Sequence, residues 1–272
     1  LKHLGAISPG FQADFVVLDN LTDLNVTDVF YKGKRLNEDA PIRVRPCSHV
    51  LKHTVHLDKV KAERFLLPIS KKKTHVIEIH AGQITTTDLT ISLPPTLNFE
   101  PFGGYSKIAA VERHHNTGKI GVAVAKGYGI RNGAVASSVS HDSHNIIVIG
   151  DNDVDMAIAV NEIIRTQGGY TVVENGKVYE TLALPIMGLM SDAGFENVNE
   201  ALQRMIQKAH QMGVATQIDP FVTLSFLALP VIPELRITPR GICKMTAKGP
   251  IILSQWNRTG NGKENTICNQ IY

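Results

Sequence analysis

The stretch GAVASSVSHDSHNIIVIG, residues 133–150, sets five polar residues between two apolar segments. Residues 135–139 and 146–149 are short runs of small and β-branched residues, which is typical of buried β-strands. Residues 141–145, His-Asp-Ser-His-Asn, separate the two runs. A polar stretch at the end of a strand can be held rigidly and still face a cleft. The pattern therefore predicts two core strands joined by a candidate functional loop.

The residue types of this loop allow several kinds of chemistry. Histidine can ligate a metal or shuttle protons, and aspartate can orient a histidine or ligate the metal itself. On an extended backbone, His141 and Ser143 would point to one side and Asp142 and His144 to the other, so one ion could not reach both histidines without a turn. Two interpretations stay open: a polar turn that satisfies buried backbone groups, or a contribution to a functional site.

Segments outside this stretch carry both strand and helix signals. Apolar residues at helical spacing predict helices over residues 58–67, 151–166 and 195–212. The Asn175-Gly176 turn predicts a hairpin over residues 170–182. Further strands are expected at residues 14–18, 26–31, 75–79, 83–87, 89–93, 108–112 and 119–125. Because strands and helices do not alternate regularly, the predicted fold class is α+β.

Length and local composition divide the chain. At roughly 150 residues per domain, 272 residues correspond to about two domains. Residues 1–45 predict a small β unit that needs partner strands, followed by a linker, and residues 46–243 form the main α+β domain. Residues 244–272 are polar and rich in Asn, Gly and Thr, which predicts a disordered or divergent tail. The chain begins Leu1-Lys2-His3, which we interpret as the interior of a longer polypeptide.

Composition excludes several partners. With 28 Lys and Arg against 25 Asp and Glu, the net charge of +3 is too small to indicate a nucleic-acid partner. Three widely spaced cysteines are typical of a reducing compartment, so the expected location is the cytoplasm. No apolar run approaches the ~18 residues of a membrane span, so no membrane partner is expected.

Familiar sequence motifs are also missing. The stretch Gly127-Tyr-Gly129-Ile-Arg-Asn132 lacks the third glycine of a dinucleotide-binding loop, and neither a phosphate-binding P-loop nor a hydrolase nucleophile elbow occurs. Cys47 lacks the second cysteine of the zinc deaminase pattern. Arg113-His114-His115 precedes a turn, which indicates exposed loop histidines. The loop at residues 141–145 thus remains the main candidate.

Several motifs together carry a resemblance to a known family. They are VERHH at 111–115, KGYG at 126–129, GAVASS at 133–138, HDSHN at 141–145, LPIMGLMS at 184–191 and PFVTLSFLALP at 220–230. They resemble the C-terminal region of bacterial adenine deaminase, a family of the amidohydrolase superfamily. Residues 5–34 are similar to the closing strands of the small β domain of amidohydrolases. The resemblance covers residues 1–243 and is lost after Ile242.

The resemblance implies a reaction and its cofactor. In that family a metal-activated water attacks C6 of adenine, which yields hypoxanthine and ammonia, and the metal is Mn or Fe. The metal ligands come from a (β/α)₈ barrel of about 250 residues, which this chain lacks. The resemblance therefore implies that the principal ligands lie upstream of this chain, that the chain alone binds no metal, and that it alone is inactive. The expected partners are adenine, the missing catalytic barrel and further copies of the protein.

Within this chain, the resemblance leaves His141, Asp142 and His144 as candidates for an accessory catalytic role only. They could orient the leaving amine, bind purine nitrogens or hold an extra metal. Two alternatives stay open. The domain could serve only for packing and oligomer assembly. It could also be an independent metal-binding module, for which His141, Asp142, His144 and His115 would have to converge on one point.

Overall fold

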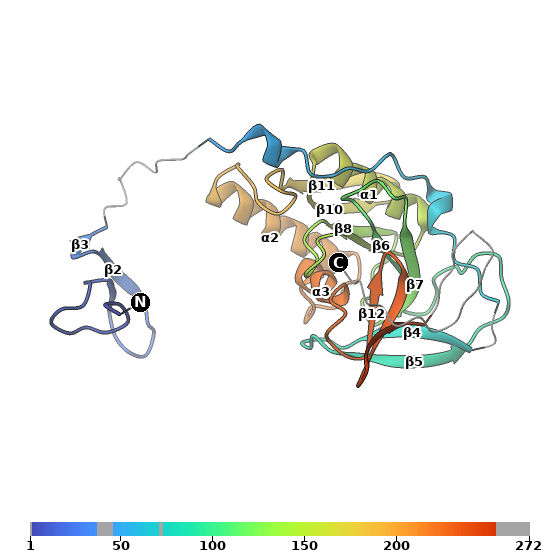
Figure 1. Cartoon of the computed structure of the whole chain (residues 1–272), viewed down its shortest axis with the longest axis horizontal. Helices are drawn as coiled ribbons and strands as arrows, with labels where there is room; N and C mark the ends of the chain where they lie inside the picture. Colours follow the sequence, from blue (N-terminus) through green and yellow to red (C-terminus); the bar gives the residue numbers. More distant parts are fainter. Residues whose placement is uncertain (1, 37–45, 71–72, 254–272) are drawn as a thin grey trace. The chain divides into compact units, whose positions relative to one another are not determined.

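The computed structural model describes residues 2–36, 46–70 and 73–253. Its backbone separates into two compact units, Leu1–Pro46 and Cys47–Tyr272 (Figure 1). Among the described helices, none has the length and apolar content that crossing a bilayer requires. Each unit is described on its own.

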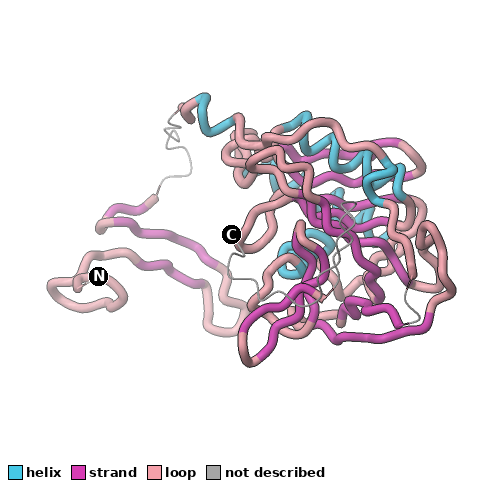
Figure 2. The backbone as a smooth tube through the Cα atoms, turned by 45° about the vertical axis from the view of Figure 1, so that its right-hand side comes forward, coloured by secondary structure: helices cyan, strands magenta, loops and turns pink. Residues whose placement is uncertain are grey.

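The N-terminal unit is a three-stranded antiparallel sheet, in the order β1(Phe15–Leu18), β2(Val26–Tyr31) and β3(Lys34–Arg35). The tube view shows only strands and loops in its described part (Figure 2). The rings of Phe15 and Phe30 face each other across β1 and β2, with centroids 4.7 Å apart. Val16 and Val17 stay exposed, because a sheet this small cannot cover its own faces. The two strands predicted at residues 14–18 and 26–31 are confirmed.

The larger unit is built on one eight-stranded sheet in the order β11-β10-β8-β9-β6-β7-β4-β5. Neighbouring strands are antiparallel, except for the parallel pair β4 and β7. The strands are β4(Lys73–Ile79), β5(Thr86–Ser92), β6(Tyr105–Val111), β7(Ile120–Lys126), β8(Gly133–Ser137), β9(Ile146–Gly150), β10(Gly169–Glu174) and β11(Lys177–Ala183). The predicted α+β class is thereby confirmed.

Helical segments and a second sheet cover the two faces of this sheet. Helix α1(Asp153–Thr166) packs on one face together with the 3₁₀ turn η2(Ala62–Phe65). The other face carries α2(Phe195–Gln211), α3(Pro220–Leu227) and the antiparallel sheet of β12(Leu235–Thr238), β13(Gly241–Thr246) and β14(Gly249–Ile252). The central strands are therefore buried on both sides, which explains their continuous apolar composition.

Strand β9 shows how one strand serves two cores. Ile146 and Val148 belong to the hydrophobic cluster under α1. Ile147 and Ile149 belong to the cluster under α2 and α3. The alternation follows from the two-residue period of a strand. All four side chains are fully buried.

Three sequence predictions need correction. The helix expected over residues 58–67 is only the single turn η2, because Asn161 of α1 bonds the backbone N–H and C=O of Val60 (both 2.8 Å) and holds that stretch extended. The strands expected at residues 83–87 and 89–93 are one strand, β5.

The third correction concerns the predicted tail at residues 244–272. Residues 244–246 and 249–252 lie in β13 and β14, where β13 pairs with β12 and Ile252 is buried. Pairing with a neighbouring strand supplies the backbone hydrogen bonds that stabilise this segment. The polar composition of the segment gives no sign of that pairing. Residues 254–272, with Trp256 and Cys268, lie outside the described part of the chain.

Candidate functional site

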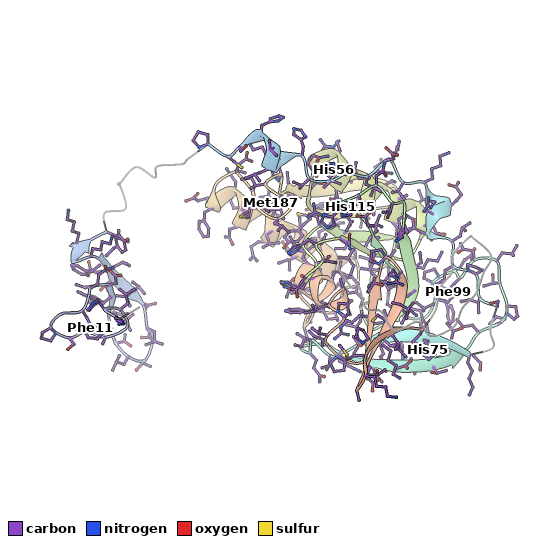
Figure 3. The ribbon with its side chains drawn as sticks, viewed as in Figure 1. Phe11, His56, His75, Phe99, His115 and Met187 are labelled. Atoms are coloured by element: carbon purple, nitrogen blue, oxygen red, sulfur yellow. The ribbon has the colours of Figure 1, made fainter. Side chains whose placement is uncertain are left out.

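Three connections leave the same end of the large sheet. The register pairs Val111 at the end of β6 with Ile146 at the start of β9, and Ser137 at the end of β8 with Tyr170 near the start of β10. Gly169 in turn pairs with Ala183, the last residue of β11. The segments 112–119, 138–145 and 184–194 therefore emerge together, and the labels of His115 and Met187 mark two of them in Figure 3. Motifs distant in the sequence meet at this end.

Arg113 joins these segments. The residue is only 1% exposed. The guanidinium donates hydrogen bonds to the carbonyl oxygens of Thr54 (3.0 Å) and Met187 (3.0 Å), and its Nε donates to the carbonyl of His144. Burial lowers the pKa of Arg113 to about 10, so the group is still a cation at neutral pH. Among the described residues, its charge is balanced by carbonyl dipoles and no carboxylate is paired with it.

The segment 186–190 fits closely against this guanidinium. Gly188 has a φ of +71°, and a Cβ built there would lie 2.7 Å from Arg113 Nη1. The Ser138 hydroxyl donates to the Gly188 carbonyl at 2.6 Å, which ties this segment to the start of the loop at residues 138–145. Glycine is required here by both the left-handed backbone and the close approach.

Glu112 organises the neighbouring turn. Its carboxylate accepts hydrogen bonds from the backbone N–H groups of His114 (2.5 Å), His115 (2.9 Å) and Thr117 (3.0 Å), and from the Thr117 hydroxyl (2.9 Å). Burial alone would raise the pKa of Glu112, but these hydrogen bonds outweigh it and hold the pKa below the usual value. The turn presents His114, whose Nε2 lies 2.8 Å from the carbonyl oxygen of Ser143 and so donates to it.

The candidate loop itself is a closed turn. The Ser140 hydroxyl donates to the Asn145 carbonyl (2.6 Å), and the His144 N–H donates to the Ser140 carbonyl (2.7 Å). The His141 N–H donates to the Ser225 carbonyl of α3 (3.1 Å), and the ring of His141 lies 5.1 Å from that of Phe226. The loop is therefore held by its own bonds, by Arg113 and by α3.

This turn overturns the expectation from extended backbone. The rings of His141 and His144 approach to 6.4 Å between centroids instead of pointing to opposite sides. The side chains of His141 and Asp142 are 41% and 61% exposed, with His141 Nδ1 3.8 Å from Asp142 Oδ1. The side chains of His141 and Asp142, the first two residues of the loop, therefore face solvent.

His144 lies deeper than its two neighbours. Its Nδ1 is buried and has no hydrogen-bond partner. Burial lowers the pKa of His144, and the positive charge of Arg113 lowers it further. The ring is therefore neutral at neutral pH and has one N–H donor and one acceptor nitrogen. Of the three candidates, only His144 has a buried ring nitrogen without a hydrogen-bond partner.

Two other expectations about histidines have different outcomes. Arg113-His114-His115 was expected to be an exposed loop, yet Arg113 is buried and His114 is partly buried, and only His115 is exposed. Sequence reasoning missed Arg113, because an arginine after an apolar strand gives no sign that it turns inward. Across the described ranges no group of three His, Cys, Asp or Glu could hold a metal ion, so His141, Asp142, His144 and His115 do not converge as a metal-binding module requires.

A cleft of about 460 Å³ lies on the neighbouring surface, between residues 57–64 and the turn at residues 116–120. Its lining includes Arg64, which donates to the Gly118 carbonyl, and Asp58, which accepts from Asn116. None of the three loop candidates lines it. The loop therefore does not form a wall of this cleft.

Comparisons with known proteins agree with the sequence motifs. The family model described as the adenine deaminase C-terminal domain matches residues 83–248, more than half of the chain. The match runs beyond Ile242, so the pattern is not lost there as the sequence suggested. The chain is 47% identical over 243 residues to the adenine deaminase of Desulfitobacterium hafniense, and 42% identical over 248 residues to that of Nitratidesulfovibrio vulgaris.

The extent of these matches is also informative. A third adenine deaminase, from Petrotoga mobilis, is 41% identical over 251 residues. Each alignment covers 89% of this chain but only 43% or 44% of the relative, so the chain spans less than half the length of the curated relatives it matches. The chain belongs to the adenine deaminase C-terminal domain family.

Proposed function

We propose that this chain is the C-terminal part of a cytoplasmic adenine deaminase, whose complete polypeptide hydrolyses adenine to hypoxanthine and ammonia. The proposal is supported by the family match and by relatives that are named adenine deaminase and are more than twice as long as the matched region. Because the matching family model is described as a C-terminal domain, we propose that a further region precedes this segment. We propose that this region is the catalytic barrel and that the N-terminal strands of this chain complete its small β domain.

The metal of the proposed reaction belongs outside this chain. A divalent ion, Mn or Fe, would supply a hydroxide at neutral pH by lowering the pKa of bound water. The described residues contain no group of three ligands that fits such an ion. We therefore propose that this chain contributes by binding, orienting and shielding the substrate, and that none of its described residues activates the water.

His144 is the residue that we assign to this task. The single observation that carries the assignment is that its buried Nδ1 has no hydrogen-bond partner. The backbone of His144 is nevertheless held in place by Arg113 and by the Ser140 carbonyl. A neutral imidazole can accept a hydrogen bond from the amine of adenine or donate one to a ring nitrogen. His141 and Asp142, exposed beside it, would meet the catalytic barrel.

The test is the rate constant of the complete polypeptide on adenine. We expect His144→Ala to lower kcat/KM about ten- to a hundredfold, as the loss of one hydrogen bond to a buried substrate does. His56→Ala is the matched control, because His56 is an exposed histidine of the same unit. An unchanged kcat/KM for a normally folded His144→Ala protein would remove His144 from the mechanism.

Purified alone, the 272-residue chain should not turn over adenine, and turnover would contradict the placement of the metal ligands.

A second candidate function is packing and assembly without a catalytic contribution. It is favoured by three exposed apolar residues between the end of β11 and the first residue of α2, namely Met187, Met190 and Phe195. A contiguous exposed apolar patch marks an interaction site, and these three residues are the candidates for one. Under this alternative, Met190→Lys would change the oligomeric mass in sedimentation while His144→Ala left kcat/KM intact. The opposite pair of results supports the accessory role.

A further inference from the structure

Two histidines near the beginning of the larger unit face each other at the surface. His49 opens the 3₁₀ turn η1(His49–Lys52), and His53 is its C-terminal cap. Their Nε2 atoms are 3.0 Å apart, and their ring centroids are 4.3 Å apart. Both residues are exposed, so ions in solution can reach them. This pair lies in a different part of the sequence from the candidate loop at residues 141–145.

The spacing of the two nitrogens matches a chelate. Imidazole nitrogens bind transition metals at about 2.0–2.1 Å. Two nitrogens held 3.0 Å apart at that bond length enclose an angle of about 95° at the ion. This is close to the right angle between adjacent positions of a square or octahedral complex and below the tetrahedral angle. Geometry therefore favours Ni²⁺ or Cu²⁺ over a tetrahedral ion.

The turn is held in place before any ion binds. The Leu51 carbonyl accepts a hydrogen bond from the Met187 N–H (2.7 Å), and Lys52 forms an ion pair with Asp192. Because Lys52 is paired with a carboxylate, its charge is balanced close to the turn. A backbone fixed in this way loses little freedom when the two rings converge on an ion.

We propose that His49 and His53 form a two-imidazole site for a divalent transition-metal ion of square or octahedral preference, Ni²⁺ or Cu²⁺. The described residues provide no third His, Cys, Asp or Glu ligand there, so water completes the coordination. Ligation replaces the hydrogen bond between the two rings. The site is separate from the metal of the proposed deaminase reaction and does not depend on that proposal.

The test titrates Ni²⁺ into the 272-residue chain, prepared without a histidine tag and followed by calorimetry. Ni²⁺ is the probe because it does not oxidise thiols, and Cys47→Ser is present in every variant so that the thiol two residues before His49 cannot contribute. We expect one ion per chain at this site. His49→Ala and His53→Ala should each weaken binding about tenfold or more, because each removes one of two linked ligands.

His56→Ala and His141→Ala serve as matched controls and should bind Ni²⁺ as the parent does. His56, labelled in Figure 3, lies three residues beyond His53 and is also exposed. Paramagnetic Ni²⁺ should broaden the ring signals of His49 and His53 first in an NMR titration. Absence of binding by the parent chain, equal binding by His49→Ala, or loss of binding in a control would each overturn the site. Circular dichroism checks that every variant is folded.

Discussion

Arg113 is the residue on which the candidate site is built. A buried cation without a carboxylate is costly unless every N–H finds an acceptor. Here the acceptors are carbonyl oxygens of three separate segments, at Thr54, His144 and Met187. The same side chain therefore fixes the candidate loop and places a positive charge beside the ring of His144.

Replacing this guanidinium should destabilise the larger unit. We expect Arg113→Met to lower the free energy of unfolding by about 3 kcal/mol or more, because three partly buried carbonyls lose the donor that they share. Urea unfolding followed by circular dichroism measures the change. Arg204→Met is the control, since Arg204 is exposed and paired with Glu180 on the surface, and it should have little effect. Equal stability losses for the two variants would contradict the role of Arg113.

The histidines beside Arg113 should make stability depend on pH. Burial is the first cause that lowers the pKa of His144 and of His114, with the Arg113 charge adding to it in both. The unfolded chain then binds a proton more readily than the folded chain. Their contribution to stability is therefore present above the ordinary value of 6.5 and is lost as the pH falls below it toward the folded pKa.

This dependence can be measured from urea midpoints between pH 5 and 8. Below pH 6.5 we expect the midpoint of the parent to fall, and we expect His144→Ala to reduce that fall, because one of the two shifted groups is gone. His56→Ala, which removes an exposed histidine that shifts neither group, should leave the slope as it is. A slope that is the same in the parent and in His144→Ala would show that His144 is not shifted.

At the scale of elements, local sequence decides where α1 begins and ends. The Asn152 side chain accepts the Asp155 N–H at 2.8 Å and caps the helix. Gln167 takes the left-handed conformation at the other end, and the Gly168 N–H donates to the Ile163 carbonyl at 2.9 Å. The predicted helix and its end before Gly168 are confirmed, because caps act within one turn of the helix.

Removing the cap tests this element. We expect Asn152→Ala to lower the free energy of unfolding by about 1 kcal/mol, the usual worth of an N-terminal cap. Chemical denaturation of the larger unit provides the measurement. Asn152→Ser keeps an acceptor oxygen at the cap and should recover most of the loss. If Ser proves as damaging as Ala, the effect comes from the bonds that the Asn152 amide donates to Asp151 and Asp155 and not from the cap.

At the scale of the whole molecule, the candidate site forms because three connections between elements leave the large sheet at the same end. Strand pairing sets Val111 against Ile146 and Ser137 against Tyr170, so residues more than seventy positions apart in the sequence share one end of the sheet. Arg113 then bonds Met187, and Ser138 bonds Gly188. No pattern within a single segment predicts these contacts, since pairing partners of a sheet are set by packing of the whole unit.

The sequence by itself determined the strands at residues 26–31 and 146–149, the long helices, the α+β class and the family resemblance. These features depend on periodicity, caps and turn residues, which act over a few positions. Tertiary structure alone decided that residues 58–67 stay mostly extended against α1, that residues 244–252 join a sheet, and that Arg113 is buried among carbonyls. In each case partners distant in the chain supply hydrogen bonds or exclude water, and such long-range contacts override local preference.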